Sequence, residues 1–320
     1  MLDPQAQALI RLMTDRGVPP VHTLSPVQAR AAYLERRAYS QPFPPSVGED
    51  LAEVRDLLIA AGQAPALPLR LYLPAFPITT GQPLPTLVYF HGGGWTMGDL
   101  DTHDVLCREL CAQSRVALVS VDYRVGPEHP FPAAVEDCLA ATRWVRGQAA
   151  SLGLDGARVA VGGDSAGGNL AAVVALLMRD AGDAPLKHQL LIYPATDLRA
   201  TSASHQLNGR GYLLTTENIA YYRDNYIAEP ASWSDWRASP LLAPNLSRLA
   251  PALVLTAGYD PLRDEGRQYA DALSAAGTRT QYICFERQIH GFITMGRVID
   301  EARTAVSLCA SVLRAEMTDA

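Results

Sequence analysis

Short apolar runs alternate with longer amphipathic segments along most of this chain of 320 residues. The short runs are rich in β-branched and aromatic residues, which is typical of buried strands. Between the later runs, apolar residues recur at helical spacing, and several of these segments end at a glycine, as helices often do. This alternation predicts a mostly parallel sheet with helices on both faces. The eight expected strands cover residues 53–60, 67–74, 85–90, 115–123, 158–164, 188–194, 252–260 and 280–287, and the helices between the later ones cover 102–114, 133–148, 167–182 and 264–277.

Two segments depart from this alternation. Residues 1–47 contain two helical patterns, and the second follows Ser25 and Pro26, residue types that favour a helix start. Residues 200–245 contain the helical pattern TTENIAYYRDNYIA, followed by a loop with two tryptophans. We expect both segments to lie across the carboxyl edge of the sheet, where open α/β folds bind their ligands.

The composition excludes several classes of function. The formal net charge is -6 and no block of Lys and Arg occurs, so a nucleic-acid partner is not expected. The first residues lack an apolar leader, and no apolar stretch is long enough to cross a bilayer, which predicts a soluble cytoplasmic protein without a membrane span. The five cysteines are scattered without a C-x-x-C pair, so we expect reduced thiols and no metal site.

The residues RVAVGGDSAGG join an expected strand to a helix rich in alanine and valine. They contain the pattern G-x-S-x-G, from Gly163 to Gly167, in the strand–turn–helix context that a nucleophilic serine requires. The small neighbours permit a tight turn, and the hydroxyl of Ser165 would project at the helix N-terminus, where the helix dipole favours developing negative charge. Ser165 is therefore the candidate nucleophile, in preference to a serine that only caps the helix.

A serine nucleophile needs a base to remove its proton and a carboxylate to orient that base. In this strand–serine–helix arrangement the acid and then the histidine follow the serine along the chain, each at the end of a strand. Of the seven histidines only His188, His205 and His290 follow Ser165, and only His290 comes shortly after an expected strand. Asp260 ends the preceding strand. These positions predict His290 as the base and Asp260 as its orienting carboxylate.

Three other acids stand near this candidate set. Asp197 follows the strand at 188–194 and is the alternative to Asp260 as the orienting carboxylate. Asp264 and Glu265 lie in the first turn of the helix after Asp260, where negative charge interacts favourably with the helix dipole. We therefore assign Asp264 and Glu265 a role in the helix and none in the chemistry.

The run HGGGW, from His91 to Trp95, follows the expected strand PTLVYF. A tetrahedral intermediate carries negative charge on the former carbonyl oxygen, and backbone N–H groups stabilise it. Glycines can turn their N–H groups into a site because they lack Cβ atoms, and Ala166, which follows the nucleophile, supplies a further amide. His91 is expected to hold the glycine loop by hydrogen bonds. Trp95 is expected either to wall the pocket or to pack in the core.

Four motifs resemble the hormone-sensitive lipase family of α/β-hydrolases, which includes bacterial esterases. They are HGGGW, GDSAGG, DPLRDEG and HGF, with VDYRVGPEHPFPAA between the first two, and the resemblance extends from about residue 50 to the end of the chain. It implies an α/β-hydrolase fold in which residues 48–320 form the catalytic domain. It also implies a helical cap formed by residues 1–47, to which residues 200–245 contribute.

This chain departs from the family pattern in one segment. The family usually has Y-R-L-A-P-E where this chain has YRVGPE, from Tyr123 to Glu128. That segment supports the site structurally, so the change does not affect the expected chemistry.

The resemblance also implies roles for single residues. The implied triad is Ser165, Asp260 and His290, and the implied oxyanion hole consists of the amides of Gly92, Gly93 and Ala166.

The expected function is that of a serine carboxylesterase with no metal or organic cofactor, acting on esters of short to medium acyl chains. Two alternatives remain open. Acylamidases of similar fold hydrolyse amides with the same triad, and the sequence does not separate the two leaving groups. Some members of the superfamily are non-catalytic small-molecule-binding proteins that have lost a triad residue, whereas all three positions are intact here. The expected partner is a small-molecule ester, and the resemblance allows a homodimer through an edge strand.

Overall fold

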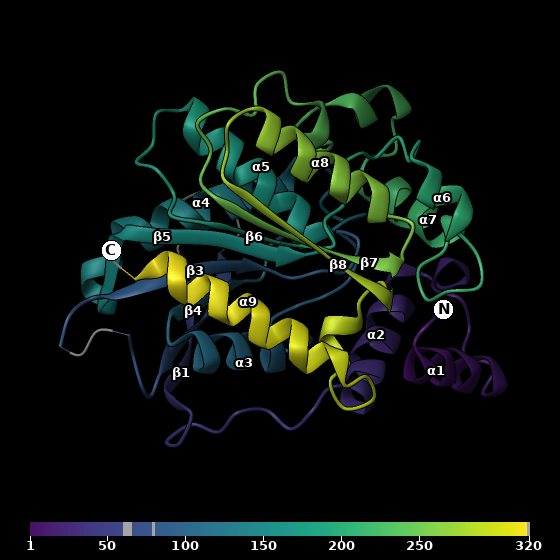
Figure 1. Ribbon diagram of the computed structural model, residues 1–320, viewed down its shortest axis with the longest axis horizontal. Coiled ribbons are helices and arrows are strands. Elements are labelled where there is room, and N and C mark those ends of the chain that lie inside the picture. Colours follow the sequence, from purple (N-terminus) through teal and green to yellow (C-terminus); the bar gives the residue numbers. More distant parts are fainter. Residues whose placement is uncertain (60–65, 79–80, 319–320) are drawn as a thin grey trace.

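The computed structural model describes residues 1–59, 66–78 and 81–318, which are arranged around one central sheet (Figure 1). Within these residues eight strands pair in the order β1-β2-β4-β3-β5-β6-β7-β8. The pairs from β4 to β8 are parallel, whereas β1 and β2 are antiparallel additions at one edge. The predicted α/β fold with a mostly parallel sheet is confirmed. The strands are β1 (Leu51–Ile59), β2 (Leu67–Pro74), β3 (Leu84–Phe90), β4 (Ala117–Val121), β5 (Leu154–Asp164), β6 (Gln189–Ile192), β7 (Ala252–Tyr259) and β8 (Thr280–Ile289).

All eight expected strands are present, although residue 60, at the end of the first, lies outside the described residues. The expected helices are also present. Helix α9 was not predicted, although its buried residues recur three and four positions apart, as in an amphipathic helix. The helices are α1 (Pro4–Asp15), α2 (Pro26–Ser40), α3 (Asp104–Ser114), α4 (Ala133–Gly147), α5 (Ala166–Asp180), α6 (Ala203–Leu207), α7 (Thr216–Tyr226), α8 (Arg263–Ala275) and α9 (Glu301–Met317).

Helices cover the sheet on both faces, as the alternating pattern predicted. Figure 1 shows α4, α5 and α8 on one side of the sheet and α3 and α9 on the other. Each side has its own apolar core: Leu170 and Leu176 of α5 belong to one cluster, and Leu106 of α3 and Leu313 of α9 to the other. Burial on both faces explains why the central strands are almost continuously apolar.

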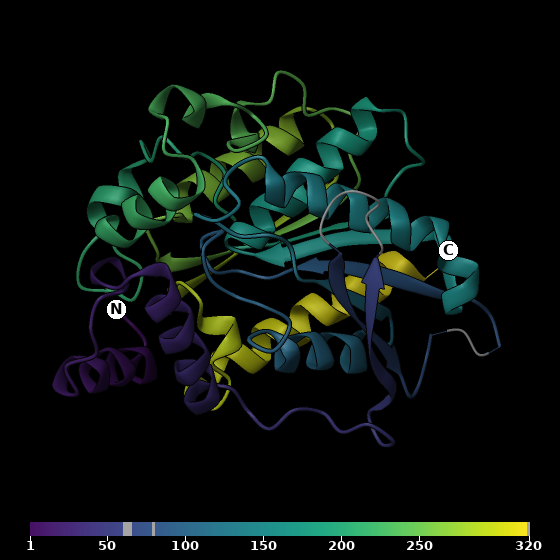
Figure 2. The same cartoon turned by 180° about the vertical axis from the view of Figure 1, so that it is seen from behind.

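The N-terminal segment packs beside α7, far from it in sequence (Figures 1 and 2). Helix α2 begins after Ser25 with a capping box that includes Gln28, which confirms the predicted helix start. His22, just before this helix, lies 2.9 Å from the side-chain oxygen of Asn218 in α7. Ala29 of α2 packs in a small cluster with Met97, which follows the glycine loop. These contacts place α2 and α7 against that loop.

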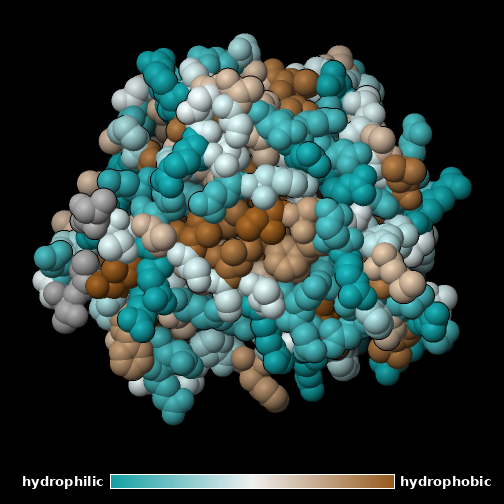
Figure 3. All heavy atoms as spheres, viewed as in Figure 1, coloured by the Kyte–Doolittle hydropathy of each residue, from teal (hydrophilic) through white to brown (hydrophobic). Residues whose placement is uncertain are grey.

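Strand β8 forms one edge of the sheet. Apolar side chains gather in the middle of the face shown in Figure 3, between α8 and α9, where Figure 1 draws β8. The homodimer through an edge strand stays a prediction.

Among the helices of the described residues, none has the length and hydrophobicity needed to span a bilayer. The cytoplasmic location also stays a prediction.

Candidate active site

Ser165 stands at a sharp turn between β5 and α5. Its backbone has φ 56° and ψ -116°, a left-handed conformation that a non-glycine residue adopts only when its surroundings enforce it. The turn presses the start of α5 against the end of β3. A Cβ atom on Gly167 would lie 1.9 Å from the carbonyl oxygen of Phe90, and one on Gly163 would lie 2.4 Å from it. The two motif glycines are therefore required by close backbone approach, as the motif indicated.

The structure brings together the three residues predicted from chain order. Nε2 of His290 lies 2.9 Å from Oγ of Ser165, and Nδ1 of His290 lies 2.7 Å from Oδ2 of Asp260. The other oxygen of Asp260 accepts a hydrogen bond of 2.8 Å from the amide of Leu262. Each residue follows the carboxyl end of a different parallel strand, and such ends lie along one edge of the sheet. The result is a continuous hydrogen-bonded chain from serine to carboxylate.

The residues of the hydrogen-bonded triad differ in how deeply they are buried. The side chain of Asp260 is fully buried, whereas that of His290 is 13% exposed. The ring of Tyr193, also fully buried, packs against the imidazole with 4.6 Å between ring centroids. The carboxylate is therefore shielded from water, which strengthens its interaction with the imidazole, while the imidazole keeps a small exposed surface.

The glycine loop after β3 uses its first amide internally. The N–H of Gly92 donates to Oδ1 of Asp164 at 2.9 Å. This amide is therefore already bonded to a buried carboxylate, whereas an oxyanion donor must face the substrate oxygen. Gly93 has φ 132°, a backbone conformation that favours glycine. A Cβ atom there would lie 2.2 Å from the carbonyl oxygen of Met97.

The next two peptides of this loop are oriented through their carbonyl oxygens. Nδ1 of His91 lies 3.0 Å from the oxygen of Gly92, and the oxygen of Gly93 accepts a 2.9 Å hydrogen bond from the amide of Met97. In a trans peptide C=O and N–H point in opposite directions. The amides of Gly93 and Gly94 are thereby turned away from these contacts. Within the described part of the chain, neither amide donates a hydrogen bond.

Asp164, next to the nucleophile, was not singled out by the sequence analysis. Its Oδ1 accepts hydrogen bonds from Tyr89 at 2.8 Å and from Gly92 at 2.9 Å, and it lies 3.2 Å from Nε2 of His103. Burial opposes ionisation, but the contacts with His103, Arg37 and Tyr89 hold the pKa of Asp164 below its ordinary value. The buried, ionised carboxylate joins the serine turn to the glycine loop. The only sequence signal was its position inside the serine motif.

The flanks of the glycine loop are buried. The imidazole of His91 stacks on Tyr123 with 4.2 Å between centroids, and burial lowers its pKa to about 4. His91 is therefore neutral and contacts the loop as expected. Trp95 is only 5% exposed and stacks on Tyr226 at 4.6 Å. Of the two interpretations of Trp95, the structure favours core packing over a pocket wall, because the ring is covered by α7.

The histidines and acids set aside earlier lie in other contacts. His188 is buried just before β6, at the opposite end of that strand from the site. Oδ2 of Asp197 pairs with Nη2 of Arg199 at 2.7 Å. His205 contacts Glu265, with 2.6 Å between its Nε2 and Oε2. The sequence-based choice of His290 and Asp260 over these residues agrees with the geometry.

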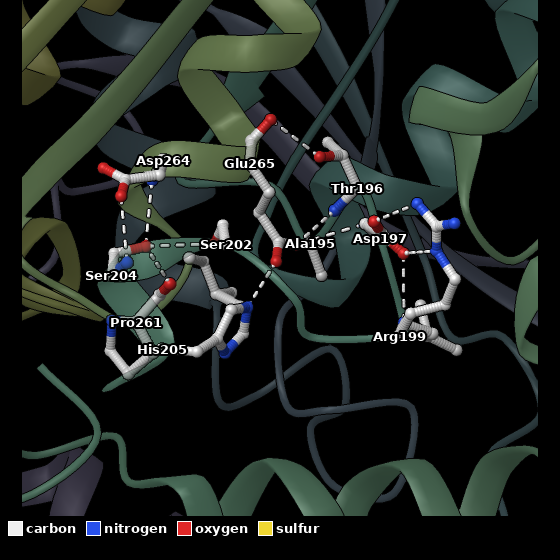
Figure 4. Close-up of polar contacts among 12 residues, drawn as sticks. Ala195, Thr196, Asp197, Arg199, Ser202, Ser204, His205, Pro261, Asp264 and Glu265 are labelled. Carbon is white, nitrogen blue, oxygen red and sulfur yellow. Dashed lines mark hydrogen bonds and ion pairs between the residues drawn. The ribbon is translucent and has the colours of Figure 1, made fainter. Parts of the chain in front are cut away.

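Glu265 has a larger role than the dipole interaction assigned to it from sequence (Figure 4). It is buried, and its Oε1 accepts hydrogen bonds from the amides of Thr196 at 2.7 Å and Asp197 at 3.2 Å. Burial raises the pKa of Glu265. With the contact to His205, these bonds fix the segment after β6 against the start of α8, directly behind the loop of Asp260. The sequence showed only an acid in a first helical turn.

The sheet and the strand–serine–helix turn define an α/β-hydrolase fold. A family model described as alpha/beta hydrolase fold matches residues 87–294. The carboxylic ester hydrolase LipN of Mycobacterium tuberculosis (strain ATCC 25618 / H37Rv) is 42% identical over 324 residues, covering 99% of this chain and 84% of LipN. Ethyl acetate hydrolase of Pseudomonas putida is 36% identical, covering 98% of each chain.

Solved structures agree with these relatives. An ester hydrolase from the metagenome of Lake Arreo, complexed with a bipyridine phosphonate derivative, superposes with a TM-score of 0.93 at 43% identity, covering 98% of this chain and 99% of that one. The thermostable carboxylesterase EstE1, cloned from a metagenomic library, gives a TM-score of 0.86 at 40% identity, covering 93% and 99%. This chain belongs to the hormone-sensitive lipase-like family of α/β-hydrolases.

Proposed function

We propose that this chain hydrolyses carboxylic esters through an acyl-enzyme formed on Ser165. The observation that carries the proposal is the hydrogen-bonded chain from Oγ of Ser165 through His290 to Asp260. The similar proteins named ester hydrolases cover almost the whole chain. The chain is a serine ester hydrolase of the carboxylesterase class.

In the first half of the reaction, Oγ of Ser165 attacks the ester carbonyl carbon. Nε2 of His290, 2.9 Å away, accepts the serine proton and then delivers it to the departing alkoxide. Oδ2 of Asp260 accepts a hydrogen bond from Nδ1–H, so that the lone pair on Nε2 faces the serine. In the second half, His290 removes a proton from water, which attacks the acyl carbonyl carbon, and the proton then passes from His290 to Oγ of Ser165 as the acid leaves.

The negative charge on the tetrahedral oxygen needs donors that are already in place. The amide of Ala166 is one, because it begins α5 and the first amides of a helix have no partner within the helix. We assign the others to Gly93 and Gly94, whose amides have no acceptor in the described residues. This assignment keeps two of the three predicted donors and replaces Gly92, whose amide binds Asp164.

The N-terminal segment and α7 would form a cap over this site, with residues 48–320 as the catalytic domain. Tyr222 of α7 lies so close to Gly94 that a Cβ atom on the glycine would be 2.3 Å from its ring. A helix packed on the oxyanion loop leaves little room for a long acyl chain. We therefore propose a preference for short to medium acyl esters.

An activity profile across p-nitrophenyl esters of increasing acyl length tests this function. We expect kcat/KM to be highest for the acetate to hexanoate esters and to decline for longer chains. Ser165→Ala provides the blank. The amidase alternative is tested with a p-nitroanilide that carries the same acyl group. Faster turnover of the anilide than of the ester would contradict the ester assignment.

The oxyanion role of the glycine loop gives a separate prediction for Gly93→Val. The position combines a positive φ with a Cβ contact of 2.2 Å to a carbonyl oxygen. The loop must therefore shift, and the amides of residues 93 and 94 lose their alignment. We expect kcat to fall by about 10²- to 10³-fold, the typical effect of losing one oxyanion donor. Labelling of Ser165 by a fluorophosphonate should fall less, and unchanged ester turnover would rule out the oxyanion role.

A further inference from the structure

Helix α2 contacts the glycine loop through the side chain of Arg30. Nε of Arg30 donates to the carbonyl oxygen of Thr96 at 2.8 Å, and Nη2 donates to that of Gly126 at 2.9 Å. Thr96 in turn holds the loop: its amide donates to the oxygen of Gly93 at 3.2 Å, and its hydroxyl to that of Gly94 at 3.0 Å. Arg30 is therefore one residue removed from the peptides that carry the proposed oxyanion donors.

A second arginine of the same helix reaches the other side of the loop. Arg37 is 6% exposed, and its Nη2 lies 3.2 Å from Nε2 of His103. The same histidine nitrogen lies 3.2 Å from Oδ1 of Asp164, the oxygen that accepts the hydrogen bond from Gly92. Arg37 also donates to the hydroxyl of Tyr33 in its own helix. The buried side chains of His103 and Asp164 therefore lie between Arg37 and the glycine loop.

The charge of Arg37 is what Asp164 requires. A buried carboxylate is costly unless it is hydrogen-bonded and matched by a positive charge. Burial lowers the pKa of His103, which favours the neutral form of this imidazole. We assign its hydrogen to Nε2, which then donates to Asp164. Nη2 of Arg37 approaches the same nitrogen and, facing its hydrogen, makes no hydrogen bond to it; the guanidinium supplies the compensating positive charge beside the histidine.

We propose that Arg30 and Arg37 are positioning residues for ester hydrolysis, through which α2 holds the glycine loop in the conformation that stabilises the oxyanion. The inference rests on the proposed function. In this view α2 does more than form part of the cap over the site, because it also fixes the donors of the oxyanion hole. Arg30 acts through the carbonyl oxygen of Thr96, and Arg37 acts through its charge on Asp164, whose carboxylate binds the amide of Gly92.

The contacts of Arg30 distinguish a positioning role from a role in merely attaching α2 to the rest of the protein. Arg30 also forms a two-point ion pair with Glu128, with 2.9 Å between Nη1 and Oε1 and 2.5 Å between Nη2 and Oε2, but the side chain of Glu128 is 48% exposed. Water screens the charges of such an exposed pair. The hydrogen bonds of Arg30 to Thr96 and Gly126 do not involve Glu128. Removing the carboxylate and removing the guanidinium should therefore have different effects on catalysis.

The test compares four variants of the full chain with the wild type. Arg30→Met removes the hydrogen bonds to the loop and keeps an apolar side chain, whereas Glu128→Gln removes only the charge of its exposed partner. Arg37→Met removes the buried charge and Arg37→Lys retains it. For each protein we would measure kcat and KM for p-nitrophenyl acetate, together with the melting temperature.

Loss of oxyanion alignment lowers kcat more than it raises KM, because those hydrogen bonds form fully only in the transition state. We expect Arg30→Met and Arg37→Met to lower kcat by about tenfold or more, with KM changed by less than about threefold. Glu128→Gln should stay within about twofold of the wild type. Arg37→Lys should recover most of the activity that Arg37→Met loses.

Several results would overturn the inference. Wild-type kcat in Arg30→Met would do so, as would equal losses in Arg30→Met and Glu128→Gln. If Arg37→Met does not fold, Arg30→Met decides, because this arginine is partly exposed and its loss leaves no buried charge unpaired. A wild type that neither hydrolyses the ester nor reacts with a fluorophosphonate would overturn the proposed function as well. An active wild type with an unaffected Arg30→Met would overturn this inference alone.

Discussion

Replacing Ser165 with alanine is expected to lower kcat/KM for p-nitrophenyl esters by at least about 10⁴-fold. The hydroxyl oxygen, 2.9 Å from Nε2 of His290, forms the covalent bond in the proposed mechanism. Without it, water would have to attack the substrate directly, aided only by the remaining donors. Steady-state hydrolysis of the acetate ester, measured with enough enzyme to detect residual turnover, gives the ratio.

Covalent labelling with a fluorophosphonate complements this measurement and distinguishes an enzyme from a binding protein. The wild type should become labelled and Ser165→Ala should not. A suitable control is Ser204→Ala, because the hydroxyl of Ser204 is buried and donates to the carbonyl oxygen of Pro261. It should keep the label. No label on the wild type, or equal label on Ser165→Ala, would support the non-catalytic alternative.

Replacing Asp260 with asparagine is expected to lower kcat by about 10³- to 10⁴-fold. Asp260 is fully buried and holds Nδ1 of His290 at 2.7 Å. An amide NH₂ group facing Nδ1 would favour the tautomer with hydrogen on Nε2, which cannot accept the serine proton. The negative charge that stabilises the imidazolium would also be lost. Pre-steady-state measurement with p-nitrophenyl acetate should show that formation of the acyl-enzyme is slowed.

The matched control for this prediction is Asp197→Asn, since Asp197 was the alternative acid. Its carboxylate pairs with Arg199 at 2.7 Å, and that arginine is partly exposed. We expect kcat of Asp197→Asn to stay within about threefold of the wild type. A large loss in Asp197→Asn together with an active Asp260→Asn would reverse the assignment of the orienting carboxylate.

Much of the fold followed from local patterns. The apolar runs located the central strands, because a strand buried on both faces has few polar positions. The partly exposed edge strands β1 and β8 were located by their β-branched and aromatic residues. The start of α2 followed from Ser25 and Pro26, whose backbone preferences are local. The apolar spacing of α9 is regular too, so this helix is also encoded by a local pattern. The order of serine, acid and histidine followed from topology, because each must stand after a strand at the same edge.

Contacts between distant segments could not be derived in the same way. Whether the amide of Gly92 or that of Gly94 faces the substrate depends on Asp164, 72 residues away from Gly92. The burial of Trp95 depends on its stack against Tyr226 of α7. Glu265 resembles an ordinary first-turn acid until the segment after β6 supplies its hydrogen-bond donors. None of these partners is adjacent in sequence.

The sequence by itself determined the sheet, the strand ends at which chemistry-bearing residues stand, and the choice of Ser165, Asp260 and His290 as the candidate triad. Hydrophobic periodicity and turn chemistry act over a few residues, so a linear pattern is enough to reveal them. Only the tertiary structure decided which amides of the HGGGW run are available and which residues hold that loop. Hydrogen-bond donors and buried charges are assigned by contacts in space, and here those contacts join α2, the glycine loop and the turn at Ser165.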